Sequence, residues 1–329
     1  MIIAENLSKI FYTKTKTKLW KKATTIKVEA VKDFSITVPQ GKIIGLLGTN
    51  GAGKTTIIKM LSAMLQPSSG NIYIDNLDII SAPIEAKKRL NLITGGERNI
   101  YWRLSANENL RYFGALYGLH GSVLEQRISN ILETVGLKEN KDIPVEKFSK
   151  GMKQRLQIAR GLINDPEYIF LDEPTLGLDI FIAHDLKKYI QKLAEVENKG
   201  ILLTTHYIKE AEELCDYIYV IHKGKTIIEG TPEGIKKHCN TQNKIRISVL
   251  NNCLRLPEQL SKVAGVVNVK ILQDQDENAT NEIEILSNRD VIRDIVELLE
   301  AEQNPILKIV SLHSSLEDVL YSFIKEADS

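Results

Sequence analysis

The chain has 329 residues, enough for two domains, and its 43% hydrophobic and 26% charged residues are ordinary for a globular protein. A net charge of +1 gives no overall field that would indicate nucleic acid as the main partner, and three scattered cysteines exclude a disulfide framework and a CxxC metal site, which fits a reducing compartment. No apolar run approaches the ~20 residues of a membrane helix and the N-terminus lacks the pattern of a signal peptide, so we expect a cytoplasmic chain whose membrane role needs a partner.

The N-terminal part predicts two strands, at residues 2–7 and 30–38, with Phe11 and Tyr12 after the first. Between the strands, residues 13–22 are rich in lysine and contain a tryptophan but no acid. Alternating threonine and lysine suit the exposed edge of a solvated hairpin. The same composition suits a basic finger beside anionic lipid headgroups, and the sequence leaves both interpretations open.

A glycine-rich loop at residues 48–56 lies between an apolar run at 42–47, which predicts a buried strand, and a run at 57–65, which predicts a helix. Strand, glycine loop and helix in this order is the context of a P-loop. Glycines leave room for backbone N–H groups to turn toward an anion, and the helix directs its positive dipole end to the same point. Lys54 can then reach the β- and γ-phosphates of a nucleotide, and the Thr55 hydroxyl can bind Mg²⁺.

Short apolar strands and amphipathic helices alternate after this loop, which indicates an α/β sheet covered on both faces. The predicted strands lie at residues 71–75, 91–94, 168–171, 201–204, 217–221 and 225–228. The predicted helices lie at residues 84–90, 105–117, 122–135, 153–163, 182–196 and 208–214. Ser105 and Glu108 stand at capping-box positions of a largely helical insert.

Two of these strands end in residues that suit phosphate chemistry. Asp172 and Glu173 follow the strand at 168–171, at the edge of an α/β sheet where ligands bind. Asp172 suits Mg²⁺, directly or through a water, and Glu173 is placed to take a proton from an attacking water. His206 follows the strand at 201–204 and either donates a hydrogen bond to a phosphate or is a half-buried polar residue.

The alternation of buried strands and helices ends around residues 236–243. The predicted elements in the rest of the chain have the order βαββαβ followed by a helix. This order suits a small ferredoxin-like domain, and it contains no nucleotide loop and no catalytic cluster. The predicted strands lie at 245–249, 266–271, 282–286 and 306–311, and the helices at 257–263, 290–300 and 315–324.

Together the motifs of residues 1–238 resemble those of the ATP-binding cassette (ABC) ATPases. The resemblance rests on segments in the family's order and spacing, namely residues 48–56, 149–155, 168–173, 174–179 and 204–206. It implies an α/β fold with a P-loop core, an antiparallel β subdomain and a helical subdomain at about residues 97–163. The ATPase domain would span residues 1–238, and a small α+β ferredoxin-like accessory domain would span residues 239–329.

The resemblance implies ATP and Mg²⁺ as ligands, with Phe11, or Tyr12 instead, stacked on adenine. The residues that would cradle the phosphates are Gly48, Thr49, Asn50, Gly51, Ala52, Gly53, Lys54, Thr55 and Thr56. The catalytic residues would be Lys54, Glu173 as general base and His206 as the switch histidine, and the magnesium ligands would be Thr55 and Asp172.

In this family the signature segment of one subunit closes on ATP held by the other, so the resemblance implies a second ATPase subunit and we expect a homodimer. The residues supplied from the opposite subunit would be Ser149, Lys150, Gly151 and Asp179. The Ser149 side chain and the Gly151 amide stand at a helix N-terminus, which is an anion site without a phosphate of its own.

Two departures from the family pattern affect this assignment. Lys150 stands where the family has a first glycine, and Met152 stands where it has glutamine. The family's loop glutamine has no counterpart, because Gly96 takes its position, and either Glu97 or a water could replace it as a magnesium ligand.

The resemblance predicts the ATP-hydrolysing subunit of an exporter, coupled to a separate polytopic permease that holds it at the inner face of the cell membrane, with no nucleic-acid partner. The C-terminal domain, including residues 315–320, resembles the domain appended to drug-resistance-type ABC exporters. The alternative is a soluble ABC ATPase that acts on ribosomes or DNA. The chain has a single P-loop and no long coiled coil between the motifs, and both observations argue against this alternative. A third interpretation makes the ATPase a switch for a sensory C-terminal domain.

Overall fold

The computed structural model describes residues 1–15, 24–94, 100–239, 243–249, 256–272, 281–302, 305–312, 316–317, 320, 323–324 and 327. Most of the lysine-rich segment, Gly96 and Glu97 therefore lie outside the described residues. The chain forms two compact units, Met1–Pro232 and Glu233–Ser329. No helix within the described ranges is long and apolar enough to span a bilayer.

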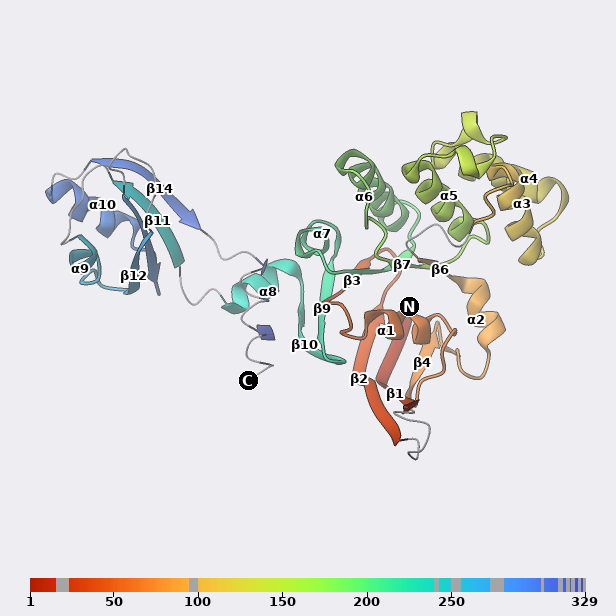
Figure 1. Cartoon of the computed structure of the whole chain (residues 1–329), viewed down its shortest axis with the longest axis horizontal. Helices are drawn as coiled ribbons and strands as arrows, with labels where there is room; N and C mark the ends of the chain where they lie inside the picture. The colour runs from red at the N-terminus through yellow and green to blue at the C-terminus, as the bar shows by residue number, and fades with distance from the viewer. Residues whose placement is uncertain are drawn as a thin grey trace. The chain divides into compact units, whose positions relative to one another are not determined.

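The first unit contains a six-stranded sheet in the order β10-β9-β3-β8-β7-β6 (Figure 1). Its strands are β3 (Ile43–Gly48), β6 (Leu90–Thr94), β7 (Tyr168–Asp172), β8 (Gly200–Thr205), β9 (Tyr217–His222) and β10 (Lys225–Gly230). Neighbouring strands are parallel except for the β9–β10 hairpin, which turns at Lys223 and Gly224. Every residue of β3 and β8 is buried, because helices and the second sheet cover both faces, and these strands accordingly have unbroken apolar sequences.

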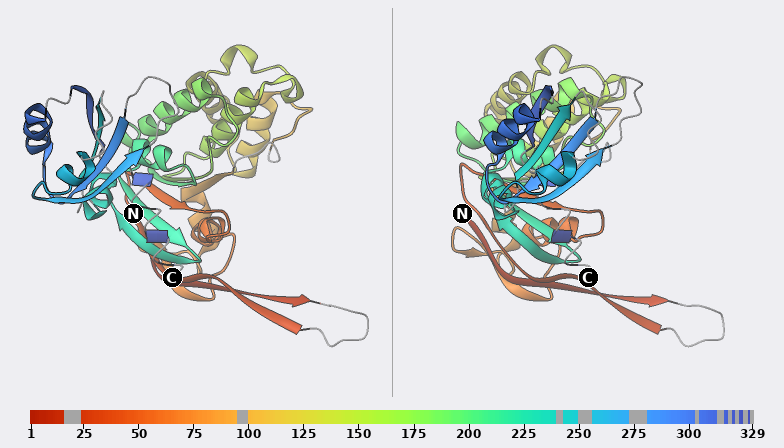
Figure 2. Two further views of the ribbon diagram at one scale, coloured as in Figure 1. Left: turned by 60° about the vertical axis from the view of Figure 1, so that its left-hand side comes forward. Right: turned by 90° about the vertical axis from the view of Figure 1, so that its left-hand side faces the viewer.

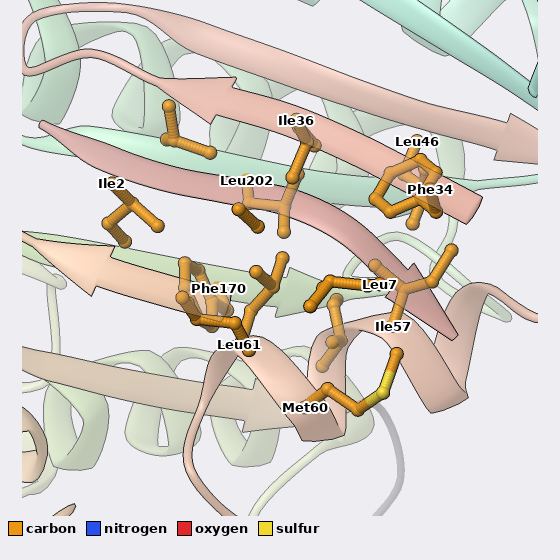
Figure 3. Close-up of a cluster of buried hydrophobic side chains, with 14 of the residues drawn as sticks. Ile2, Leu7, Phe34, Ile36, Leu46, Ile57, Met60, Leu61, Phe170 and Leu202 are labelled. Carbon is orange, nitrogen blue, oxygen red and sulfur yellow. The ribbon is translucent and has the colours of Figure 1, made fainter. Parts of the chain in front are cut away.

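A four-stranded sheet in the order β2-β1-β4-β5 packs against this one through helix α1 (Lys54–Leu61). Its strands are β1 (Ile2–Thr15), β2 (Thr24–Val38), β4 (Ser69–Ile74) and β5 (Leu77–Asp78). Figure 3 shows Ile57, Met60 and Leu61 of α1 pointing toward apolar side chains of both sheets, among them Leu7 and Phe170. The strands β1 and β2 are longer than predicted, since their antiparallel pairing continues out to Thr15 and Thr24.

Helices cover the sheet and form the predicted helical insert. They are α2 (Pro83–Arg89), α3 (Ala106–Leu116), α4 (Gly121–Thr134), α5 (Lys150–Leu162), α6 (Ile180–Glu195) and α7 (Ile208–Leu214), with 3₁₀ turns at Lys138–Asn140 and Val145–Lys147. The capping box of α3 is present, with Ser105 Oγ accepting from the Glu108 amide and Glu108 Oε2 accepting from the Ser105 amide. Helices α5 and α6 begin two or three residues earlier than predicted, because Ser149 and Asp179 are their N-caps.

The second unit has the predicted βαββαβ order, and its antiparallel sheet runs β12-β13-β11-β14. Its elements are β11 (Asn243–Val249), α9 (Leu256–Leu260), β12 (Val266–Leu272), β13 (Asn281–Ser287), α10 (Ile292–Ala301) and β14 (Ile306–Leu312). The described residues of the expected helix at 315–324 are helical. Helix α8 (Pro232–Cys239) was not predicted, although a proline at the first helical position is a helix-start signal.

Candidate active site

Three neighbouring parallel strands bring the predicted catalytic motifs to one edge of the six-stranded sheet. β8 lies between β3 and β7, with Leu47 of β3 opposite Thr205, and Asp172 of β7 opposite Thr204. The P-loop follows β3, Glu173 follows β7, and His206 follows β8. Because the carboxyl ends of parallel strands meet at one edge, segments more than 100 residues apart in sequence form a single site.

The P-loop has the backbone geometry of an anion cradle. A Cβ atom at Gly48 would lie 2.4 Å from the carbonyl oxygen of Ile221, so only glycine fits there. Gly53 has a φ of +113°, and a Cβ atom at this residue would lie 2.7 Å from the carbonyl oxygen of Ala30. Helix α1 begins directly after Gly53 and has no side-chain cap, which leaves its first N–H groups for a ligand.

Lys54 lies inside this loop, with only 6% of the residue exposed. Its Nζ atom donates hydrogen bonds to the carbonyl oxygens of Gly48, at 2.6 Å, and Thr49, at 3.2 Å. Burial lowers the pKa of the Lys54 ammonium, while the carboxylates of Glu173 and Asp172 act in the opposite direction. A buried ammonium beside free helix amides fits a phosphate group well.

The two carboxylates at the end of β7 have different environments. Asp172 Oδ1 accepts a 2.6 Å hydrogen bond from Thr204 Oγ1 on the neighbouring strand. Glu173 has a φ of +50°, a left-handed conformation that costs a non-glycine residue about 1–2 kcal/mol. Its amide is held by the Thr204 carbonyl at 3.1 Å, and this contact turns the side chain away from the strand direction.

His206 lies next to Glu173, with 3.2 Å between Nδ1 of the imidazole and Oε1 of the carboxylate. Both side chains are about a quarter exposed, so a water can reach the carboxylate. The ring of Tyr207 stacks against that of His206 with 4.1 Å between centroids. The site therefore brings a partly exposed carboxylate, an adjacent imidazole and a buried ammonium to one edge of the sheet.

The residues present fit a magnesium ion that is shared with phosphate oxygens. Thr55, in the first turn of α1, and Asp172 offer the hard oxygen donors that Mg²⁺ takes in proteins. No group of three or more His, Cys, Asp or Glu side chains suited to a metal occurs among the residues that the structure covers. A site with one carboxylate and one hydroxyl agrees with an ion that keeps waters and substrate ligands. The third candidate ligand, Glu97, belongs to the part of the chain that is not described.

The adenine-stacking candidates lie on β1, in the antiparallel sheet. Phe11 is 38% exposed and Tyr12 is 68% exposed. Lys9 Nζ lies 5.5 Å from the centroid of the Phe11 ring. The two aromatic rings point to opposite faces of the strand, since side chains alternate along it, so only one of them can face a given ligand.

The signature segment forms the N-terminus of α5. Ser149 Oγ accepts from the amide of Met152 at 3.2 Å. A Cβ atom at Gly151 would lie 2.3 Å from Cδ1 of Ile182 in α6, so a larger residue at 151 would force the Ile182 side chain to move. The Lys150 ammonium extends to Gly177, where a Cβ atom would lie 2.4 Å from Nζ. The side chain that replaces the family's glycine thus lies over residues 174–179.

Two contacts that the sequence did not predict fix the loop after Glu173. Gln154 of α5 donates from Nε2 to the carbonyl oxygen of Pro174 at 3.0 Å and is buried. Thr175 Oγ1 donates to Oε1 of Glu210 in α7 at 2.7 Å, and Glu210 is only 3% exposed. Asp179 ends the loop as the N-cap of α6, since its Oδ1 accepts from the Ile182 amide. Both contacts depend on polar side chains, Gln154 and Glu210, that are buried in the structure. No pattern around these two residues in the sequence indicates that they are buried.

Comparison with known proteins agrees with this geometry. The sequence profile of the family described as "ABC transporter" matches residues 31–176, a range that includes the P-loop, the signature segment and Glu173. The chain is 43% identical over 208 residues to the ABC transporter ATP-binding protein NatA of Bacillus subtilis (strain 168), covering 63% of this chain and 84% of NatA. It is 38% identical over 205 residues to the Nod factor export ATP-binding protein I of Cupriavidus pinatubonensis, covering 62% of each. The solved structure of an ATP-binding subunit of an ABC transporter superposes with a TM-score of 0.61 at 28% identity, covering 73% of this chain and 93% of that one.

Proposed function

The chain belongs to the ABC transporter family of ATPases, and from that premise we propose that it is the ATP-hydrolysing subunit of an exporter whose permease is a separate polytopic membrane protein. The observation that supports the assigned chemistry most strongly is the meeting of Lys54, Glu173 and His206 at one sheet edge. The direction of transport is proposed from the export role in the name of the Cupriavidus pinatubonensis relative.

In the proposed reaction, the amides at the start of α1 and the Lys54 ammonium neutralise charge on the terminal phosphate of ATP. Glu173 accepts the proton of the attacking water, and His206, 3.2 Å away, keeps the carboxylate in place. Thr55 and Asp172 would hold a Mg²⁺ ion, which would supply further charge neutralisation at the phosphate oxygens. Either Phe11 or Tyr12 stacks on the adenine. Each is replaced by alanine in turn, and the variant with the lower ATP affinity in a titration identifies the stacking residue.

We further propose that two copies of the chain enclose two ATP molecules, each copy supplying Ser149, Lys150, Gly151 and Asp179 to the site of the other. Exposed apolar side chains beside Asp179 support this arrangement. Leu176 is 48% exposed, Ile180 is 85% exposed and Phe181 is 84% exposed. A second subunit that covers these side chains would remove the apolar surface from water.

The proposed location is the cytoplasmic face of the cell membrane, where the permease holds the ATPase domain of residues 1–238. The accessory domain of residues 239–329 then stabilises the complex or its dimer. Among its described residues no group of three or more His, Cys, Asp or Glu side chains is suited to hold a metal ion. A ribosome- or DNA-directed ATPase is the competing function.

The test is co-purification. The chain, carrying a tag, is expressed together with the membrane protein encoded beside it, and the complex is isolated in detergent. An exporter subunit retains the membrane protein and hydrolyses ATP faster in the complex than alone. Stimulation of the isolated chain by ribosomes or DNA, with no retained membrane protein, would refute the exporter assignment and favour the competing function.

A further inference from the structure

The hairpin of β1 and β2 extends beyond the sheet to which it belongs. β1 pairs with β4 only as far as Ser8, which lies opposite Ser69, whereas its pairing with β2 continues to Thr15. Residues 10–15 and 24–29 therefore form a ribbon of two strands, which we call the β1–β2 ribbon. Figure 2 shows these strands running side by side away from the other strands of their sheet. A two-stranded ribbon by itself is only marginally stable in water.

One face of the β1–β2 ribbon is apolar and uncovered. Ile26 and Val28 alternate along β2 and share a face, and Phe11 is the cross-strand partner of Val28. Ile26 is 49% exposed and Val28 is 47% exposed, so water reaches about half of each side chain. The other face carries the exposed pair of Tyr12 and Lys27. The ribbon is thus amphipathic, with apolar side chains on one face and an aromatic and cationic pair on the other.

The segment that contains the ribbon also holds a concentration of positive charge. Seven lysines and no acidic residue lie between Glu5 and Glu29, whereas the whole chain of 329 residues has a net charge of only +1. This segment contains no arginine, which is the residue suited to bidentate recognition of a single phosphate or carboxylate. Lysines act as point charges and suit a diffuse negative surface, and the apolar face excludes a purely electrostatic partner such as a nucleic-acid backbone.

We propose that the β1–β2 ribbon is a docking surface for an anionic lipid bilayer. Ile26 and Val28 enter the boundary between headgroups and acyl chains, and Lys27, on the other face, remains at the level of the lipid phosphates. Each lysine near such a surface strengthens binding about fivefold. Phe11, the cross-strand partner of Val28, lies on the same face.

The experiment uses the purified full chain alone, so its outcome does not depend on the exporter assignment. Co-sedimentation is measured with vesicles of phosphatidylcholine containing about one third phosphatidylglycerol, and with vesicles of phosphatidylcholine only. The proposal predicts binding to the first kind and none to the second. It also predicts release as NaCl rises from about 0.1 M to about 1 M, since the Debye length then falls from about 10 Å to about 3 Å. Equal binding to both kinds of vesicle, or no binding to either, overturns the proposal.

Matched variants locate the surface. Lys14→Gln/Lys27→Gln should lower the partition coefficient about 25-fold, whereas Lys262→Gln/Lys308→Gln, which removes the same charge from the second unit, should leave it unchanged. Ile26→Ser should weaken binding, whereas Ile271→Ser, at an isoleucine that is also 49% exposed on a strand, should not. None of these residues belongs to the ATPase site, so unchanged basal ATPase activity shows that each variant is folded. Equal effects of the ribbon variants and their controls would assign binding to overall charge or to another surface and refute the proposal.

Discussion

Replacement of Glu173 by glutamine tests the proposed chemistry most directly. The amide has the shape of the carboxylate, so the contact with His206 at 3.2 Å and the backbone bond to Thr204 at 3.1 Å can both persist. What is lost is the basicity of one oxygen. A positioned general base contributes about 10²- to 10⁴-fold, so kcat should fall by this factor, equivalent to about 2.7–5.4 kcal/mol of transition-state stabilisation.

Phosphate release measures the rate, and titration with ATP and Mg²⁺ measures binding, which Glu173→Gln should leave within a few-fold of the wild type. Glu139→Gln, at an exposed glutamate in a 3₁₀ turn, is the matched control and should keep full activity. Turnover of Glu173→Gln within tenfold of the wild type would remove Glu173 from the role of base. Loss of ATP binding together with turnover would instead assign it to the binding of substrate.

Three further predictions concern the loop, the helix packing and the buried tyrosine. Lys54→Ala should lower ATP affinity about 10- to 100-fold, because it removes a buried charged donor, and an unchanged affinity in a titration would contradict the P-loop assignment. Gly151→Ala places a Cβ atom 2.3 Å from Ile182 Cδ1, so thermal melts should show a fold that is less stable by about 1–3 kcal/mol. Adding Ile182→Val removes the contacting methyl group and should recover part of this loss. If no stability is recovered, the contact with Ile182 is not the cause. Burial, and then the hydrogen bond from Tyr168 to Asp75, raise the pKa of the Tyr168 phenol, so the folded state keeps a proton that the unfolded state loses near pH 10. The free energy of unfolding, measured in urea titrations, should therefore fall as pH rises above about 10. Tyr168→Phe should be about 1 kcal/mol less stable at neutral pH but should show a smaller fall at high pH. Parallel pH curves for the two proteins would exclude Tyr168 as a contributor.

Local sequence patterns were sufficient for most of the architecture. The P-loop, the carboxylates at 172 and 173, the capping box of α3 and the βαββαβ order of the second unit depend on residue types within a few positions of one another. Burial on both faces gives β3 and the first part of β8 their apolar sequences, which is why the positions of these strands could be predicted. The observed starts of α5 and α6 differ from the predicted ones because each helix begins directly after its N-cap, Ser149 or Asp179.

What the sequence by itself determined is therefore the set of chemical groups and the order of the elements. The tertiary structure alone decided how those groups act together. Glu173 has a left-handed backbone and an amide that donates to β8, the close contact at Gly151 is with a side chain of α6, and the acceptor of the Gln154 side chain is 20 residues away. The length of the β1–β2 ribbon likewise depends on pairing across its two strands. The physical reason is the same in each case: these features arise from contacts between segments that are separate in the chain, and no local propensity specifies which segments will meet.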